Sequence, residues 1–151
     1  MDSCVLRDLD WRLRLYGCRI LGEVNHMDLI ETYLSNLQTI HSMTLDDYGD
    51  KRKVKRSNKL ADINRQIATD IENKYPEYKE NFSKLLLHDN WEVRCQVAHH
   101  MLEVMNYPNE YRKMALDEIK DVINKNILVE SIGNKMWLQQ WYEQHPQDKQ
   151  L

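Results

Sequence analysis

Apolar residues recur at intervals of three and four over most of the chain, the spacing that places side chains on one face of an α-helix. These stripes begin near Met27 and continue to Trp141. No segment alternates between apolar and polar residues for long enough to form a typical strand. Only four Gly and three Pro are present, too few for an all-β fold with many tight turns. The sequence therefore predicts an all-α fold.

Each expected helix has its own apolar stripe. The stripes run over residues 29–40, 60–71, 78–86, 91–105, 111–123 and 136–141, the second of them on a long polar helix from about residue 50 to residue 74. Pro76 and Pro108 suit the first turns of the third and fifth helices, where an amide has no partner in any case. Ser131 is expected to cap the last helix, which carries Met136, Trp137 and Trp141.

A chain of 151 residues is long enough for one domain with a hydrophobic core. We expect this domain over residues 27–145, an N-terminal extension over residues 1–26 and a C-terminal tail over residues 146–151. Residues 15–18 resemble a lipoprotein cleavage box, but Arg12, Arg14 and Arg19 interrupt the apolar segment that such a signal needs. No run of about 18 uncharged apolar residues exists, so no membrane span is expected. The three scattered cysteines favour a reducing cytoplasm over a disulfide framework.

The segment HDNWEVRCQVAHHML, residues 88–102, concentrates polar side chains on one expected helix. Asp89 and Glu92 fit a capping box, in which each side chain bonds a free amide of the first turn. The apolar residues fall on one half of a helical wheel, whereas Cys95, His99 and His100 fall on the other half. We therefore expect surface histidines.

Metal binding and catalysis are the alternatives for these side chains. Cys95 and His99 are four residues apart and could share a metal ion. A zinc site needs three or four ligands, and no Cys-x-x-Cys or His-Glu-x-x-His pattern supplies them. Neither an orienting acid nor an oxyanion hole accompanies Cys95 at a recognisable spacing. The sequence predicts no metal, no cofactor and no catalytic residue.

Arg94 lies in the middle of the apolar half of the same wheel. A charged side chain there must be paired, because an unpaired buried charge costs several kcal/mol. The expected partner is Asp89, one turn earlier, or an acid of an adjoining helix. Asp89 and Arg94 are therefore predicted structural residues.

Asp89, the pair Val93-Arg94, the pair Val97-Ala98 and Leu102, followed by a turn and a second amphipathic helix, resemble a HEAT repeat. The resemblance implies a short α-solenoid, a right-handed stack of antiparallel helix pairs in which the Asp and Arg positions form polar ladders. More narrowly, residues 27–145 resemble the bacterial domain of unknown function family 2019. The chain departs from the repeat pattern in having no proline before Val93, and residues 1–26 have no counterpart.

Helix-pair arrays leave an extended surface for a partner, so the sequence predicts a protein-binding module and not an enzyme. The resemblance implies a role like that of small HEAT-like immunity proteins of bacteria, which neutralise a cognate toxin. Three acids of the fifth helix, Asp117, Glu118 and Asp121, are the predicted contacts for a basic toxin domain.

Nucleic-acid binding is the alternative function. A basic belt over residues 51–65 supplies the candidate phosphate contacts Lys51, Arg52, Lys53, Lys55 and Arg56, followed by Lys59 and Arg65. Against this alternative stand the net charge of −3 and an aromatic set that is not interleaved with the bases.

Overall fold

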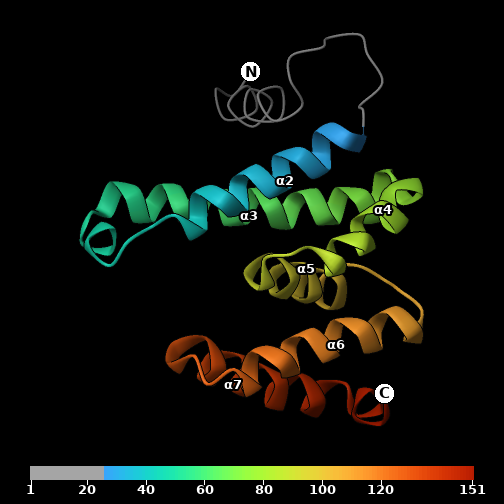
Figure 1. Ribbon diagram of the computed structural model, residues 1–151. Coiled ribbons are helices and arrows are strands. Elements are labelled where there is room, and N and C mark those ends of the chain that lie inside the picture. Colours follow the sequence, from blue (N-terminus) through green and yellow to red (C-terminus); the bar gives the residue numbers. More distant parts are fainter. Residues whose placement is uncertain (1–25) are drawn as a thin grey trace, which may run out of the picture. The chain divides into compact units, whose positions relative to one another are not determined.

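The computed structural model describes residues 26–151, and every regular element among them is helical (Figure 1). The α-helices are α2 (His26–His41), α3 (Lys51–Lys74), α4 (Lys79–Ser83), α5 (Trp91–Glu103), α6 (Asn109–Asn124) and α7 (Leu128–Gln144). Short 3-10 helices are η1 (Asp46–Gly49), η2 (Pro76–Tyr78), η3 (Lys84–Leu87) and η4 (Pro146–Gln150). None of the described helices is long and apolar enough to cross a membrane. The all-α prediction is confirmed for this part of the chain.

Two compact units make up the chain, the first extending to Ile67 and the second covering Ala68–Leu151. The division falls inside α3, which is one continuous helix. The N-terminal extension expected over residues 1–26, the lipoprotein-like box at residues 15–18 and the cysteines Cys4 and Cys18 lie outside the described residues, apart from the first residue of α2, His26.

In the first unit, α2 and the beginning of α3 form an antiparallel helix pair (Figure 1). Each helix contributes apolar residues to a buried seam, among them Leu29, Tyr33 and Ile67. Asn64 is buried in the same seam, and its Nδ2 donates to the main-chain oxygen of Tyr33 at 3.0 Å. Asn36 donates in turn to Asn64 Oδ1 at 2.9 Å, so both polar groups of the buried amide are satisfied.

In the second unit, α6 packs against both α5 and α7. The core is built mainly from small and branched apolar side chains. Its buried residues include Val93, Val97, Ala98, Met101, Leu102, Ala115, Leu116, Ile119 and Val122. Phe82 and Leu86 add to it from the segment before α5. These positions agree with the apolar stripes of the sequence.

Two expected elements differ from the structure. The single helix expected after Pro76 is divided into η2, α4 and η3, and the Ser83 hydroxyl donates to the Glu80 carbonyl at 2.7 Å within it. A serine that bonds its own backbone competes with the regular helix pattern. Ser131 does not cap the last helix, because α7 begins at Leu128 and the buried Ser131 hydroxyl donates to the Val122 carbonyl of α6 at 2.8 Å.

Most of the segment expected as a C-terminal tail, residues 146–151, forms η4 and belongs to the second unit. Asp148 of η4 is buried, and its Oδ2 accepts a hydrogen bond from Trp141 Nε1 at 2.8 Å. The same carboxylate oxygen forms an ion pair with Arg112 of α6. Through Asp148, residues 146–151 thereby connect the end of α7 to α6.

Candidate functional site

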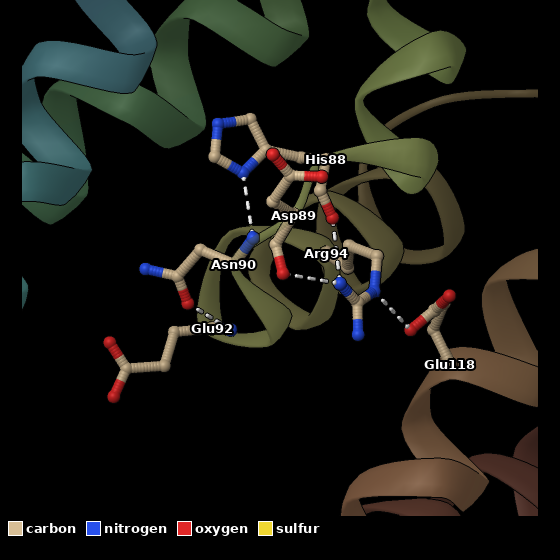
Figure 2. Close-up of polar contacts among 6 residues, drawn as sticks. All are labelled: His88, Asp89, Asn90, Glu92, Arg94 and Glu118. Atoms are coloured by element: carbon tan, nitrogen blue, oxygen red, sulfur yellow. Dashed lines mark hydrogen bonds and ion pairs between the residues drawn. The ribbon is translucent and has the colours of Figure 1, made fainter.

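Arg94 is the centre of a polar cluster between α5 and α6 (Figure 2). Its Nε donates to Glu118 Oε2 at 3.1 Å, and its Nη1 donates to the carbonyl oxygens of His88 at 2.6 Å and Asp89 at 3.0 Å. The Arg94 and Glu118 side chains are 22% and 21% exposed, so the ion pair is partly shielded from solvent. The pairing of Arg94 with an acid of an adjoining helix is confirmed. The cluster holds the loop before α5 against α6.

Asn90 caps α5, so the expectation of Asp89 as the capping residue is wrong. Asn90 has an extended backbone, and its Oδ1 accepts a hydrogen bond from the Glu92 amide at 2.9 Å (Figure 2). Asp89 lies one residue earlier and offers its main-chain carbonyl to Arg94. Asparagine and aspartate are nearly equal as N-caps, so residue type alone does not separate these two positions.

A second polar cluster joins α5 to α7 through His99. His99 Nε2 lies 2.7 Å from Asn134 Oδ1, and its Nδ1 lies 3.4 Å from Glu103 Oε1. The same carboxylate oxygen accepts from Trp137 Nε1 at 2.8 Å, and the indole meets the imidazole edge-on with 4.4 Å between ring centroids. The Cys95 thiol completes the cluster at 3.6 Å from Asn134 Oδ1.

The expectation of surface histidines on α5 is therefore wrong. His100 and Cys95 are buried, and the His99 side chain is only 17% exposed. The helical-wheel analysis assumed that other helices cover α5 on one side only. Side chains of α7 cover part of the second face, and this arrangement depends on the tertiary fold and not on the local pattern.

The surroundings of His99 raise its pKa from 6.5 to about 9. Burial lowers the pKa, but the hydrogen bonds with Cys95 and Glu103 and the contact with Asn134 outweigh burial and favour the charged ring. The Asn134 amide is oriented independently, because its Nδ2 donates to the Glu130 carbonyl at 2.8 Å and leaves Oδ1 as the acceptor toward His99. Both ring nitrogens of the imidazolium then act as donors. A ring in this state serves as a bridge between helices and has no lone pair for a general base.

Within residues 26–151, no three His, Cys, Asp or Glu side chains lie close enough together to hold a metal ion. Cys95 and His99 do lie together, as their spacing suggests, but both are engaged with Asn134.

The three acids predicted as partner contacts lie on α6 in different surroundings. Glu118 points to Arg94 in the polar cluster described above. Asp117 is half-exposed and pairs with Lys113 at 2.8 Å. Asp121 is exposed. Asp117 and Asp121 therefore lie on the accessible side of α6, and Glu118, at the edge of that side, faces α5. Asp117 shares the accessible side with Lys113.

The five bases predicted as nucleic-acid contacts lie in the first two turns of α3, and all are exposed. Lys53 turns toward η1 and pairs with Asp47 at 2.5 Å. The other bases recur at intervals of three and four and lie on one side of the helix, which Lys59 extends. We call these residues the basic stripe: Lys51, Arg52, Lys55, Arg56 and Lys59.

Sequence reasoning missed an exposed apolar surface on α7. Leu128, Val129, Ile132 and Met136 are 77%, 75%, 55% and 57% exposed. Helical spacing places them on one side of α7, opposite Trp141, which is buried at 8%. We call these four residues the outer stripe. Met136, which the sequence groups with the two tryptophans on the last helix, belongs to this exposed side, whereas Trp141 lies on the packed side.

The outer stripe has a signal in the sequence. Positions 128, 132 and 136 follow one another at intervals of four and are all apolar, separately from the Trp137 and Trp141 spacing. When a helix has apolar residues on two opposite faces, a single layer of neighbouring helices buries one face and leaves the other exposed.

No protein-family model, no curated protein and no solved structure matches this chain.

Proposed function

We propose that this protein is a non-enzymatic binding module that holds a protein partner against the outer stripe of α7. The outer stripe is the observation that carries the proposal: four large apolar side chains lie exposed on one face of a helix whose opposite face is packed. Contiguous exposed apolar surface with a polar surround is characteristic of interaction sites. Such a function requires surface complementarity and no reaction centre.

The outer stripe alone is smaller than a stable protein–protein interface. From Leu128 to Met136 the helix rises about 12 Å. Stable interfaces bury roughly 800 Å² on each partner, more than one short stripe supplies. A partner must therefore contact neighbouring surface as well. Lys125 and Lys135 are exposed near the two ends of the stripe and favour acidic groups at the edge of the partner's apolar patch.

The helical arrangement is proposed to be HEAT-like. Support comes from the packing of α5 on α6, with Arg94 paired to Glu118 between them. Within that class, we propose neutralisation of a cognate toxin as the biological role, because such a role requires stoichiometric binding alone. Of the three acids predicted as contacts on α6, Asp121 and the half-exposed Asp117 remain open to a secondary contact with this partner.

A partner captured from the native cell and then purified would allow a direct titration. The double variant Ile132→Glu/Met136→Glu is expected to weaken binding by at least about tenfold, which corresponds to about 1.4 kcal/mol. Leu45→Glu is the matched control, since Leu45 is equally apolar and 90% exposed but lies in the first unit. Melting temperatures of all variants should stay close to that of the wild type, because both sites face solvent.

Equal binding by the double variant and the wild type would refute the outer stripe as the interface. The toxin role has its own test, in which co-expression must abolish the toxicity of the partner at an equimolar ratio. A bound partner with no toxicity would refute that role and leave the binding module intact.

A further inference from the structure

The first unit contains a small pocket where α2, η1 and α3 meet. Its volume is about 240 Å³. The lining combines hydroxyl groups, two cations, one carboxylate and one thioether: Thr39, Ser42, Met43, Asp47, Lys53, Arg56 and Ser57. Drug-sized ligands occupy pockets of roughly 300–1,000 Å³. A pocket below that range suits a small polar group more than a whole apolar ligand.

The carboxylate in this pocket is already neutralised. Asp47 Oδ1 pairs with Lys53 at 2.5 Å, and Asp47 Oδ2 accepts a hydrogen bond from the Thr44 amide at 2.9 Å. The hydrogen bond with Lys53 and then that with the Thr44 backbone lower the pKa of Asp47 to about 2. Asp47 and Lys53 thus cancel, and the guanidinium of Arg56 leaves the lining with a positive charge.

Arg56 and Ser57 are the groups available to a ligand. Neither side chain makes a hydrogen bond or an ion pair within the part of the chain that the structure describes, residues 26–151. A guanidinium fork and a neighbouring hydroxyl are donors that match the oxygens of a phosphate group. The pocket therefore presents donors and net positive charge to an anion.

The positive charge of the pocket continues along the surface of α3. Arg56 belongs both to the pocket and to the basic stripe, which runs about 12 Å along α3. Like charges four residues apart destabilise a helix, here between Lys51 and Lys55 and between Arg52 and Arg56. A partner that supplies negative charge would relieve this repulsion.

An exposed aromatic residue shortly precedes these bases in the sequence. Tyr48 follows Asp47 in η1, and it is 63% exposed. Exposed aromatic rings next to a basic surface provide stacking platforms for nucleic-acid bases.

We propose that this pocket binds a phosphate group attached to a nucleoside, with Arg56 as the anchor and Ser57 as a second donor. The phosphate belongs either to a free nucleotide or to the end of a single-stranded nucleic acid. In the second case, the basic stripe contacts the phosphates that follow.

Fluorescence anisotropy with the full chain tests the proposal. The probe is a short oligothymidylate labelled at its 3′ end, with or without a 5′ phosphate. The phosphorylated probe should bind at least about tenfold more tightly, a difference of about 1.4 kcal/mol. Thymidine 5′-monophosphate and inorganic phosphate should compete for the site. Competition by the mononucleotide as strong as that by the oligonucleotide assigns the pocket to free nucleotides, whereas much weaker competition assigns it to strand ends.

Variants of the pocket and of the stripe separate the two surfaces. Arg56→Gln should abolish the preference for the 5′ phosphate. Lys59→Gln is the matched control, because it removes one charge of the stripe outside the pocket and should weaken both probes equally. Asp47→Asn should increase affinity, since it removes the one acid of the lining and releases Lys53. A gain of binding that keeps the preference for the 5′ phosphate cannot result from misfolding.

The proposal is overturned if none of the probes binds. It is also overturned if Arg56→Gln and Lys59→Gln act alike and the 5′ phosphate confers no preference, because the bases would then attract polyanions without a pocket.

Discussion

Arg94 links two helices through both its charge and its geometry. One guanidinium contacts the Glu118 carboxylate and the carbonyl oxygens of His88 and Asp89 (Figure 2). Three acceptors at fixed positions suit a planar fork better than an ammonium group. The residue therefore fixes the approach to α5 as well as its distance from α6.

Arg94→Ala is expected to lower the free energy of unfolding by about 2 kcal/mol, since hydrogen bonds to charged groups contribute roughly 1.5–3 kcal/mol. Arg94→Lys should recover only part of the loss, because an ammonium group cannot reproduce the fork. Urea denaturation followed by circular dichroism measures both variants. A loss below about 0.5 kcal/mol for Arg94→Ala, typical of an ordinary surface site, would contradict the structural role.

His99 makes the stability of the second unit depend on pH. Its pKa of about 9 in the folded protein exceeds the ordinary value of 6.5, so protonation favours the folded state. The contribution is complete below pH 6.5 and is lost as the pH rises through 9. After allowance for the partial exposure of the ring, it amounts to about 2 kcal/mol.

Urea denaturation of the wild type and of His99→Gln at several pH values tests this dependence. The wild type should lose stability between pH 6.5 and pH 9.5 relative to the variant, whose side chain does not titrate. Parallel curves for the two proteins over this range would mean that His99 is neutral in the folded state.

Residue patterns predicted that an acid pairs with Arg94, but not which acid. For His99 they wrongly predicted a surface position. The arginine was detectable because a charge among apolar neighbours requires a partner wherever the other helices lie. Glu118 itself could not be selected, since several acids occur on the adjoining helices. The surroundings of His99 come from Asn134 and Trp137, which are 35 and 38 residues away in sequence. The spacing of residues within one helix cannot reveal a contact between segments so far apart.

At the scale of elements, the start of α5 depends on one side chain. Asn90→Ala should lower the free energy of unfolding by about 1 kcal/mol, because the Glu92 amide loses its acceptor. Asp89→Ala is the matched control and should cost much less, since its contribution to Arg94 is a main-chain carbonyl that alanine retains. Thermal or urea unfolding of the two variants compares them. The reverse ranking would return the capping role to Asp89.

Helix positions were predictable to within a few residues, but helix surroundings were not. The long polar helix expected over residues 50–74 is α3, Lys51–Lys74, because its sparse apolar seam and its many helix-forming residues agree. For α7, the same reasoning found Trp141 as a buried residue and missed the opposite face. Periodicity identifies apolar faces, whereas the number of layers that cover them depends on the rest of the fold.

At the scale of the whole molecule, the C-terminal residues pack against the last two helices of the second unit. Asp148 accepts a hydrogen bond from Trp141 and pairs with Arg112, which joins η4 to both α7 and α6. Sequence reasoning assigned residues 146–151 to a tail, because so short a segment has no apolar period of its own. It also predicted one domain over residues 27–145; within the chain, two compact units divide near Ile67.

Asp148→Ala should destabilise the second unit by about 3 kcal/mol, since it leaves the Arg112 charge without its partner in a poorly hydrated site. Gln147→Ala, at an exposed position of the same short helix, is the control and should change little. Thermal unfolding followed by tryptophan fluorescence measures the effect, because Trp91, Trp137 and Trp141 all belong to this unit. Equal melting temperatures would show that η4 contributes no stability.

The aromatic side chains at the end of α7 also have an optical consequence. The Trp137 and Trp141 rings stack at 5.0 Å with an angle of 14° between their planes, and the His145 ring stacks on Trp141 at 3.8 Å. Two indoles this close couple their electronic transitions, and an imidazole in contact with an indole quenches its emission. Unwinding of the last turn of α7 should therefore brighten the fluorescence and alter the near-ultraviolet dichroism, so the native protein carries a built-in, label-free optical probe of this end of the helix.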